Sequence, residues 1–290
     1  MELTSAMHPA LASGRTAVIT GGASGIGFAV ASKLAGTGMK LCLADSDENV
    51  DAAAETLRSA GCADVMAVRV DVGDAAAMTD LNRVVRERFG DVALLMNNAG
   101  CGGGGRPFEN PEGWSRVLNV NLIGAINGVQ AFVPQMIEQS QPSLVVNTGS
   151  KQGITSPPGD IAYNVSKAGL KTMTEGLAHS LRQLEHCHVS AHLLIPGFTY
   201  TGMMARHFPS RPAAAWTSEQ VADELLAGLA AGRFYIMCGD NETPRWLDER
   251  RILWAAGDII HDRPALSRWH PDFAGAFEEF VQANGGSDKP

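Results

Sequence analysis

Short apolar runs alternate with longer amphipathic stretches along most of this chain. Apolar runs of strand length occupy residues 16–20, 40–44, 65–70, 92–97, 143–149, 189–195 and 234–238. Between them, apolar residues recur at helical spacing over 25–37, 48–60, 75–89, 112–138, 161–185 and 216–232. Strands that alternate with helices form a parallel sheet with both faces covered by helices. The pattern therefore predicts an α/β fold: a single doubly wound domain with a parallel seven-stranded sheet flanked by helices.

The last fifty residues continue beyond the last predicted strand. Residues 1–240 are expected to form the α/β domain, and residues 241–290 a helical extension, because 248–260 and 271–284 show two further helical patterns. Four of the five tryptophans (216, 246, 254 and 269) lie in the C-terminal part. Such a concentration is more typical of packing or of a subunit interface than of a ligand cage. The extension is predicted to pack on the same domain or on a neighbouring subunit.

Charge and cysteine content exclude several functional classes. The net charge of -8 argues against nucleic-acid binding, which usually requires a basic patch. The five cysteines contain no CxxC pair, so neither disulfides nor a zinc site is expected and a cytoplasmic location is favoured. His186 and His188 are expected to straddle a helix-to-strand turn, and no metal site is predicted. No secretory signal or uninterrupted run of about 18 apolar residues is visible, so no membrane span is expected.

A glycine-rich turn, TGGASGIG at 20–27, follows the first predicted strand and opens a helix. Small residues let backbone amides approach a phosphate at the positive end of the helix dipole. Asp45 ends the second predicted strand, where a carboxylate accepts hydrogen bonds from the adenosine ribose hydroxyls and repels a 2′-phosphate. No arginine follows it closely in the sequence. These residues predict a Rossmann-like dinucleotide site that prefers NAD(H) to NADP(H), although Asp45 as a helix N-cap is the alternative.

Tyr163 and Lys167 stand four residues apart in AYNVSKAGLKTMTEGL, a spacing that places both side chains on one helix face. Lowering the phenol pKa from about 10 to about 7 requires roughly 4 kcal/mol of phenolate stabilisation. One positive charge about 4 Å away supplies roughly that much at an effective dielectric constant of about 20. The pair can therefore act as a general acid/base, although the same spacing also occurs by chance on surface helices.

The chain closely resembles the short-chain dehydrogenase/reductase family. The matching motifs, in order, are TGGASGIG, Asp71-Val72, NNAG (97–100), Asn121, Ser150, YNVSK (163–167) and PGFTYTG (196–202). The resemblance covers about residues 14–205 and implies the catalytic residues Asn121, Ser150, Tyr163 and Lys167. Ser150 would bind the substrate oxygen, and Tyr163 would transfer its proton. Lys167 would lower the phenol pKa and bind the nicotinamide ribose, and Asn121 would anchor a water that links Lys167 to solvent.

The resemblance also implies a dinucleotide site that runs along one end of the sheet. Its residues would contact the pyrophosphate, the adenosine, the cleft and the nicotinamide in turn. The implied set is Gly21, Ser24, Gly25, Ile26, Gly27, Asp45, Asp71, Val72, Asn98, Ala99, Gly100, Tyr163, Lys167, Pro196, Gly197, Thr199 and Thr201.

The substrate is less constrained by the resemblance. Family members close a lid over it, here about 199–216, and the apolar lid residues suggest a hydrophobic or aromatic secondary alcohol or its ketone. The residues expected to contact it are Ser150, Gln152, Tyr163, Met203, Met204 and Phe208. A wall without side chains at 102–105 is expected to be open or mobile. A polyol, sugar or sterol dehydrogenase and a non-catalytic NAD-sensing protein are the alternatives, and a homodimer or homotetramer through helices 112–138 and 161–185 is expected.

Overall fold

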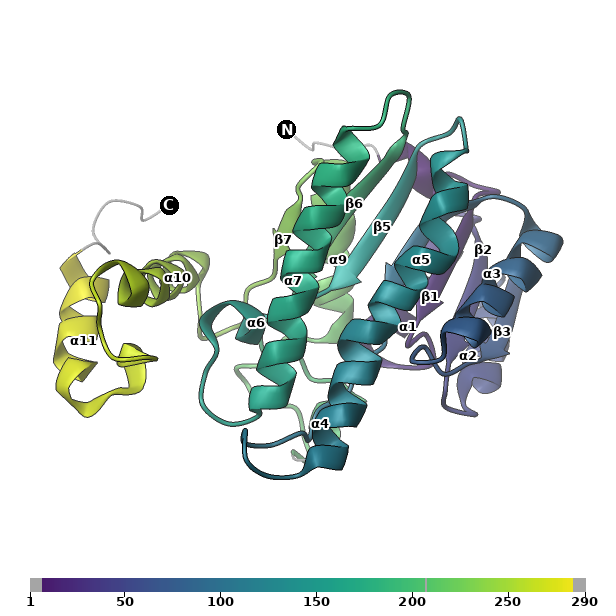
Figure 1. Ribbon diagram of the computed structural model, residues 1–290. Coiled ribbons are helices and arrows are strands. Elements are labelled where there is room, and N and C mark those ends of the chain that lie inside the picture. Colours follow the sequence, from purple (N-terminus) through teal and green to yellow (C-terminus); the bar gives the residue numbers. More distant parts are fainter. Residues whose placement is uncertain (1–6, 207, 284–290) are drawn as a thin grey trace, which may run out of the picture.

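A computed structural model describes residues 7–206 and 208–283 and contains one seven-stranded sheet (Figure 1). The strand order is β3-β2-β1-β4-β5-β6-β7, and every pairing is parallel. The predicted fold class is confirmed. The strands are β1 Thr16–Thr20, β2 Lys40–Asp45, β3 Val65–Arg69, β4 Val92–Asn97, β5 Ser143–Thr148, β6 Val189–Ile195 and β7 Tyr235–Met237.

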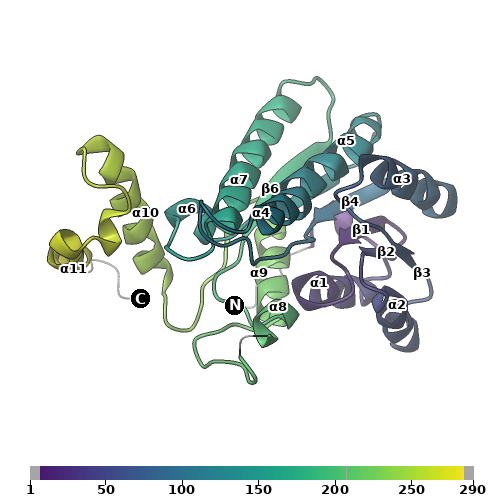
Figure 2. The same cartoon turned by 60° about the horizontal axis from the view of Figure 1, so that its bottom comes forward.

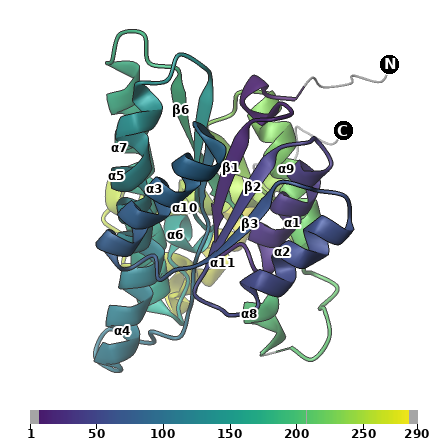
Figure 3. The same cartoon turned by 90° about the vertical axis from the view of Figure 1, so that its right-hand side faces the viewer.

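Helices cover both faces of the sheet (Figure 3). One layer consists of α1 (Gly25–Ala35), α2 (Val50–Ser59) and α9 (Ser218–Ala230), whose apolar residues form one buried cluster with the strands. The other consists of α3 (Ala75–Phe89), α5 (Gly124–Ile137) and α7 (Ile161–Arg182), which form a second cluster. The strand order reverses between β1 and β4. In an open sheet of this kind, the carboxyl ends of the strands at that reversal form the ligand crevice.

The predicted helix at 112–138 is interrupted. α4 (Pro111–Leu118) passes through a π-helical turn, Asn119–Ile123, before α5 begins. A π turn inserts an extra residue into the helix and often marks a functional position. Here it carries Asn121, whose side chain is buried at the end of the crevice.

The stretch Pro111–Ile137 is long and apolar enough to cross a membrane on length and composition alone. This qualifies the sequence-based exclusion of a membrane span, which considered only uninterrupted apolar runs. In the structure, 44% of its most apolar window is buried inside the protein. α5 packs on α3 and α4 packs on α7, so this stretch belongs to the helical layer over the sheet.

The C-terminal helices form an arm beside the domain, which we define as residues 245–283 (Figures 1 and 2). It contains α10 (Arg245–Ile260) and α11 (Ala274–Ala283), and α10 packs on the short helix α6 (Gln152–Thr155). Trp254 is the buried centre of the arm. The ring centres of Phe277 and Phe280 lie 5.4 and 5.3 Å from that of Trp254, the first edge-on and the second tilted. The guanidinium carbon of Arg263 lies 3.8 Å above the centre of the Trp254 ring. The arm thus has a small apolar core of its own.

We expect Trp254→Ala to unfold the arm while the α/β domain stays folded. Truncating a buried tryptophan costs roughly 3–5 kcal/mol, and Trp254 contacts Phe277, Phe280 and Arg263 as well as donating to Ser267. Limited proteolysis should cut the variant rapidly within residues 245–283. Trp246→Ala, which removes a 42% exposed tryptophan from the same helix, is the control. Equal protease resistance of the two variants would contradict this role for Trp254.

Candidate active site

Tyr163 and Lys167 lie on the first two turns of α7 and face the carboxyl end of β5. The ammonium of Lys167 lies 5.6 Å from the centre of the Tyr163 ring and donates a 2.7 Å hydrogen bond to the backbone oxygen of Thr148. Lys167 is only 4% exposed. The structure therefore places both residues on one helix face, with Ser150 two residues beyond the end of β5.

Burial shifts the pKa values of both groups. Desolvation raises the pKa of the Tyr163 phenol, and a hydrogen bond from Ser150 opposes the rise. Desolvation also lowers the pKa of Lys167 to about 8. The predicted lowering of the phenol pKa by Lys167 is wrong for the protein by itself, because loss of hydration penalises the phenolate more than its surroundings stabilise it. The phenol is a proton donor at neutral pH.

Asn121 joins the π turn to α7. Its amide group donates to the Cys101 backbone oxygen at 2.9 Å and to the Ser166 hydroxyl at 3.0 Å, and its oxygen accepts from the Cys101 backbone amide at 2.7 Å. Both amide hydrogens are thus used by protein acceptors. A water that accepts from this side chain, as the family resemblance implies, would have to replace one of them.

Asp160 organises the glycine-rich loop at 101–105, which was expected to be open or mobile. One carboxylate oxygen accepts from the backbone amides of Gly103 and Gly104 at 2.6 and 3.3 Å. The other oxygen accepts from the backbone amide of Gly105 at 3.0 Å and from that of Tyr163 at 3.2 Å. The bond to Tyr163 makes Asp160 the N-cap of α7. A Cβ on Gly104 would come within 2.2 Å of Ala162. The loop is therefore tied closely to the catalytic helix.

The turn between β1 and α1 has the features of a phosphate cradle. Gly21 and Gly25 have φ values of 65° and 57°, which only glycine adopts without strain. A Cβ on Gly27 would lie 2.3 Å from the Gly21 oxygen. The Ser24 N-cap makes no side-chain cap bond among the described residues, so the first amides of α1 are not capped by it. Small residues at an uncapped helix N-terminus fit a pyrophosphate.

Asp45 lies at the end of β2, beside this turn. Its carboxylate accepts from the Ala23 amide at 3.0 Å and from the Asp47 amide at 3.1 Å. The N-cap of α2 is Asn49, so the alternative role of Asp45 as a helix cap is wrong. The sheet also pairs Asp45 with Arg69 of β3, whose guanidinium donates to the Ser46 backbone oxygen. An arginine therefore lies near Asp45, although none follows it closely in the sequence.

The other residues expected to bind the dinucleotide lie along the same edge. The Asn98 amide donates to the Thr20 and Gly21 oxygens, and a Cβ on Gly100 would lie 3.7 Å from the Lys167 nitrogen. A Cβ on Gly25 would lie 3.5 Å from Thr201, which places the loop after β6 over the start of α1. The remaining members of the set occupy the ends of β3, β4 and β6: Asp71, Val72, Ala99, Pro196, Gly197 and Thr199.

Known proteins resemble this chain in both sequence and fold. The family model for short chain dehydrogenases matches residues 15–212. The chain belongs to the short-chain dehydrogenase/reductase family. It is 33% identical over 252 residues to the 1-deoxy-11-beta-hydroxypentalenate dehydrogenase of Streptomyces avermitilis, covering 82% of this chain and 90% of that one.

Two solved structures of this family were found with different cofactors. A short-chain dehydrogenase/reductase from Burkholderia phymatum in complex with NAD matches at a TM-score of 0.79 and 34% identity, covering 87% of this chain and 96% of that one. A metagenomic short-chain oxidoreductase in complex with NADP matches at a TM-score of 0.65 and 28% identity, covering 79% and 98%. The family thus binds NAD or NADP, and the choice depends on residues around the adenosine.

The substrate residues expected from the sequence fall into two groups. Met203 and Met204 lie on α8 (Gly202–Ala205), and a Cβ on Gly102 would lie 3.9 Å from the Met203 sulfur, so the lid faces the glycine loop. Phe208 packs edge-on against Phe198 at 5.9 Å. Gln152, by contrast, begins α6 and lines a cavity shared with the arm. Asp160 and Arg69 were missed, although an aspartate just before a helix is a recognisable N-cap signal.

We expect Asp160→Ala to release the glycine loop. The variant loses the acceptor of four backbone amides, including an N-cap that is worth roughly 0.5–2 kcal/mol. Hydrogen exchange at the amides of residues 103–105 should therefore become faster, by about tenfold or more. Asp74→Ala removes the N-cap of α3 and serves as the control that should leave this loop unchanged. Unchanged exchange in the Asp160 variant would show that the carboxylate does not hold the loop.

Proposed function

We propose that the protein transfers a hydride between NAD(H) and a secondary alcohol or its ketone, with Tyr163 as the general acid/base. The observation that carries this proposal is the contact between Tyr163, Lys167 and Ser150 at the carboxyl end of β5, beside the glycine cradle. A non-catalytic NAD-sensing protein would have no need of a buried lysine beside a tyrosine. The residues implied for the dinucleotide would hold it along the strand ends.

The chain's own residues would handle the proton and the substrate oxygen. When bound, the nicotinamide supplies the hydride acceptor or donor. The Ser150 hydroxyl orients the substrate oxygen and stabilises its developing charge. In reduction the Tyr163 phenol gives its proton to that oxygen, and in oxidation the phenolate takes it. Because burial raises the phenol pKa, reduction is favoured at neutral pH, while oxidation depends on the positive charges of Lys167 and the oxidised cofactor.

The apolar lid supports a hydrophobic or aromatic substrate. Met203 and Phe208 are 36% and 39% exposed where the lid meets the crevice. A polyol or sugar would find few hydrogen-bonding groups on these side chains, whereas a sterol remains compatible with them. Ile123 and Val165, exposed on the π turn and α7, support a homodimer or homotetramer through these helices. The five free cysteines support a cytoplasmic location.

Tyr163→Phe should abolish turnover and preserve cofactor binding. Loss of a general acid/base lowers the rate by about 10²–10⁴-fold, whereas the phenyl ring keeps the packing of the site. Ketone reduction would be followed by NADH absorbance and NADH binding by its fluorescence. Tyr235→Phe, which changes a 47% exposed tyrosine, is the control. Turnover by the Tyr163 variant at the normal rate would refute the assignment.

The wild-type protein should bind NADH at least roughly tenfold more tightly than NADPH. The carboxylate of Asp45 repels a 2′-phosphate, whereas the nearby Arg69 attracts one. Asp45→Ala should therefore move the preference toward NADPH, and the double variant with Arg69→Ala should lose that gain. Asp47→Ala is the matched control, because this exposed carboxylate belongs to the same turn. A wild-type preference for NADPH would exclude the proposed role of Asp45.

A further inference from the structure

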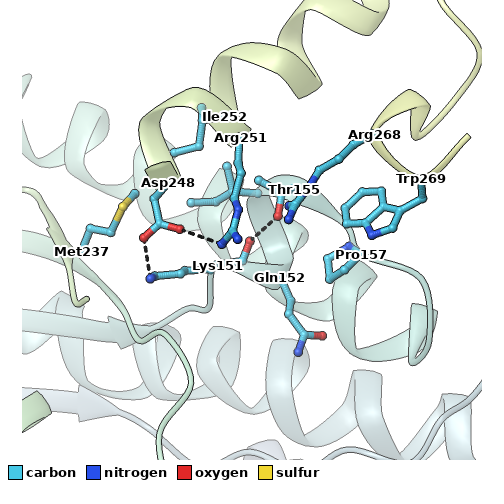
Figure 4. A pocket seen from close by; sticks show the side chains of 11 residues that line it. Lys151, Gln152, Thr155, Pro157, Met237, Asp248, Arg251, Ile252, Arg268 and Trp269 are labelled. Carbon is cyan, nitrogen blue, oxygen red and sulfur yellow. Dashed lines mark hydrogen bonds and ion pairs between the residues drawn. The ribbon is translucent and has the colours of Figure 1, made fainter. Parts of the chain in front are cut away.

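A cavity of about 290 Å³ lies between α6 and the arm (Figure 4). Gln152 and Thr155 belong to its domain side, and Arg251, Arg268 and Trp269 come from the arm. Figure 4 shows both arginines directed from the arm toward α6. Residues from two distant parts of the sequence thus line one cavity.

The charges around this cavity do not balance. Lys151 is paired with Asp240 at 3.1 Å and with Asp248 at 2.5 Å, and Arg251 lies 3.6 Å from the second of these carboxylates. Arg268 makes no ion pair or hydrogen bond within the described part of the chain, and the Arg251 Nε has no hydrogen-bond partner there. Three cations therefore face two carboxylates, which leaves one net positive charge.

The surplus charge belongs mainly to Arg268. Its guanidinium lies 4.7 Å from the centre of the Trp269 ring and 5.2 Å from that of Phe277, which support it without neutralising it. Burial, together with the nearby charge of Arg251, lowers the pKa of Arg268 to about 10. The group remains protonated at neutral pH. Asp248 attracts this half-buried cation but forms no ion pair with it in the described part of the chain, so a bound anion would give Arg268 a direct partner.

The remaining lining of the cavity is apolar. Ile154 and Pro157 contribute from the domain and Met237 and Ile252 from β7 and α10. Together with the ring of Trp269, they suit a hydrocarbon chain or a ring system. A ligand that satisfies both parts of the lining is amphiphilic, with one anionic end and an apolar body.

The cavity begins next to the catalytic residues. The Gln152 backbone amide donates to the Ser150 hydroxyl oxygen at 3.2 Å, so the lining starts two residues after Ser150. On the other side of α6, a Cβ on Gly153 would lie 2.5 Å from the Lys167 carbonyl carbon. α6 is therefore a single helical turn between α7 and the arm, and Gln152 both contacts Ser150 and lines the cavity.

We propose that this cavity binds the carboxylate end of the substrate, through Arg268 and Arg251, while the reacting carbon lies at Tyr163. The substrate class is then an oxo acid or hydroxy acid whose two functional groups are separated by an apolar chain. A single net positive charge matches a carboxylate monoanion, whereas a phosphate dianion would leave excess negative charge beside Asp248. The catalytic end of this assignment rests on the proposed function, and the carboxylate end rests on the cavity itself.

The test compares an oxo acid with its neutral ester. Binding of 9-oxodecanoate and of its methyl ester is measured by titration calorimetry in the presence of NAD⁺, under which the ketone cannot be reduced. Arg268→Gln should weaken binding of the acid by roughly 10–100-fold, the loss expected for a charge-assisted hydrogen bond. It should change binding of the ester less than about threefold. Arg245→Gln, which removes an exposed ion pair on α10 of the arm, should change neither.

Further measurements control for misfolding of the variant and for a preference for other anions. Arg268→Lys keeps the positive charge and should retain most of the preference for the acid. The wild-type protein should itself bind the acid more tightly than the ester, a comparison that does not depend on the folding of any variant. The Arg268→Gln variant should bind 4-oxopentanoate as tightly as the wild type does, because we expect this oxo acid to be too short to place its ketone at Tyr163 and its carboxylate at the arm. Tighter binding of 9-oxodecyl phosphate than of the acid would overturn the carboxylate assignment, as would equal binding of acid and ester by the wild type.

Failure of this inference can be told apart from failure of the proposed function. One outcome is that the wild type binds the acid selectively and yet fails to oxidise NADH when any of the ketones is supplied. In that case the hydride-transfer proposal fails and the carboxylate site stands. If acid and ester are bound and reduced equally, with the same response to Arg268→Gln, the carboxylate site fails and the oxidoreductase proposal stands.

Discussion

The burial of one ammonium group determines how the active site is built. Lys167 is almost fully enclosed, and its hydrogen bond to the Thr148 backbone offsets only part of the cost of removing a charge from water. The lowered pKa of about 8 expresses that cost. Gly153 has no space for a side chain, because a Cβ there would lie 2.5 Å from the backbone of this lysine. Burying such a group weakens the fold, and the proposed role of Lys167 beside Tyr163 accounts for that cost.

Two polar side chains keep the backbone around this lysine in place. Asn121 connects the loop that begins at Cys101 to Ser166 on the catalytic helix, and Asp160 connects Gly103–Gly105 to the start of the same helix. A loop rich in glycine has high conformational entropy when free. Both tethers end on α7, so the position of Tyr163 and the shape of the loop are coupled. The flexibility suggested by composition is therefore opposed by hydrogen bonds that composition does not show.

The sequence predicts what depends on local pattern and fails where distant segments meet. All strands agree with prediction to within two residues because they are apolar runs, a pattern that is local in the sequence. The π turn at Asn119–Ile123 was missed because its helical periodicity continues almost unbroken. Arg69 was missed because sheet pairing, and not chain order, brings it to Asp45. The pKa of Tyr163 depends on enclosure by several elements, which spacing along one helix cannot show.

The two ends of the crevice differ in chemistry, and this difference has a consequence for specificity. Near the lid, Met203 faces Gly102 and offers only apolar contact, which discriminates weakly between substrates of similar size. In the arm, Arg268 offers a half-buried charge that forms no ion pair with a described carboxylate. A site that must satisfy a buried charge rejects ligands lacking the matching group far more strongly than an apolar pocket rejects a wrong shape. The arm lies outside the matched family region at 15–212, so the proposed recognition of the substrate carboxylate rests on residues that the family model does not include.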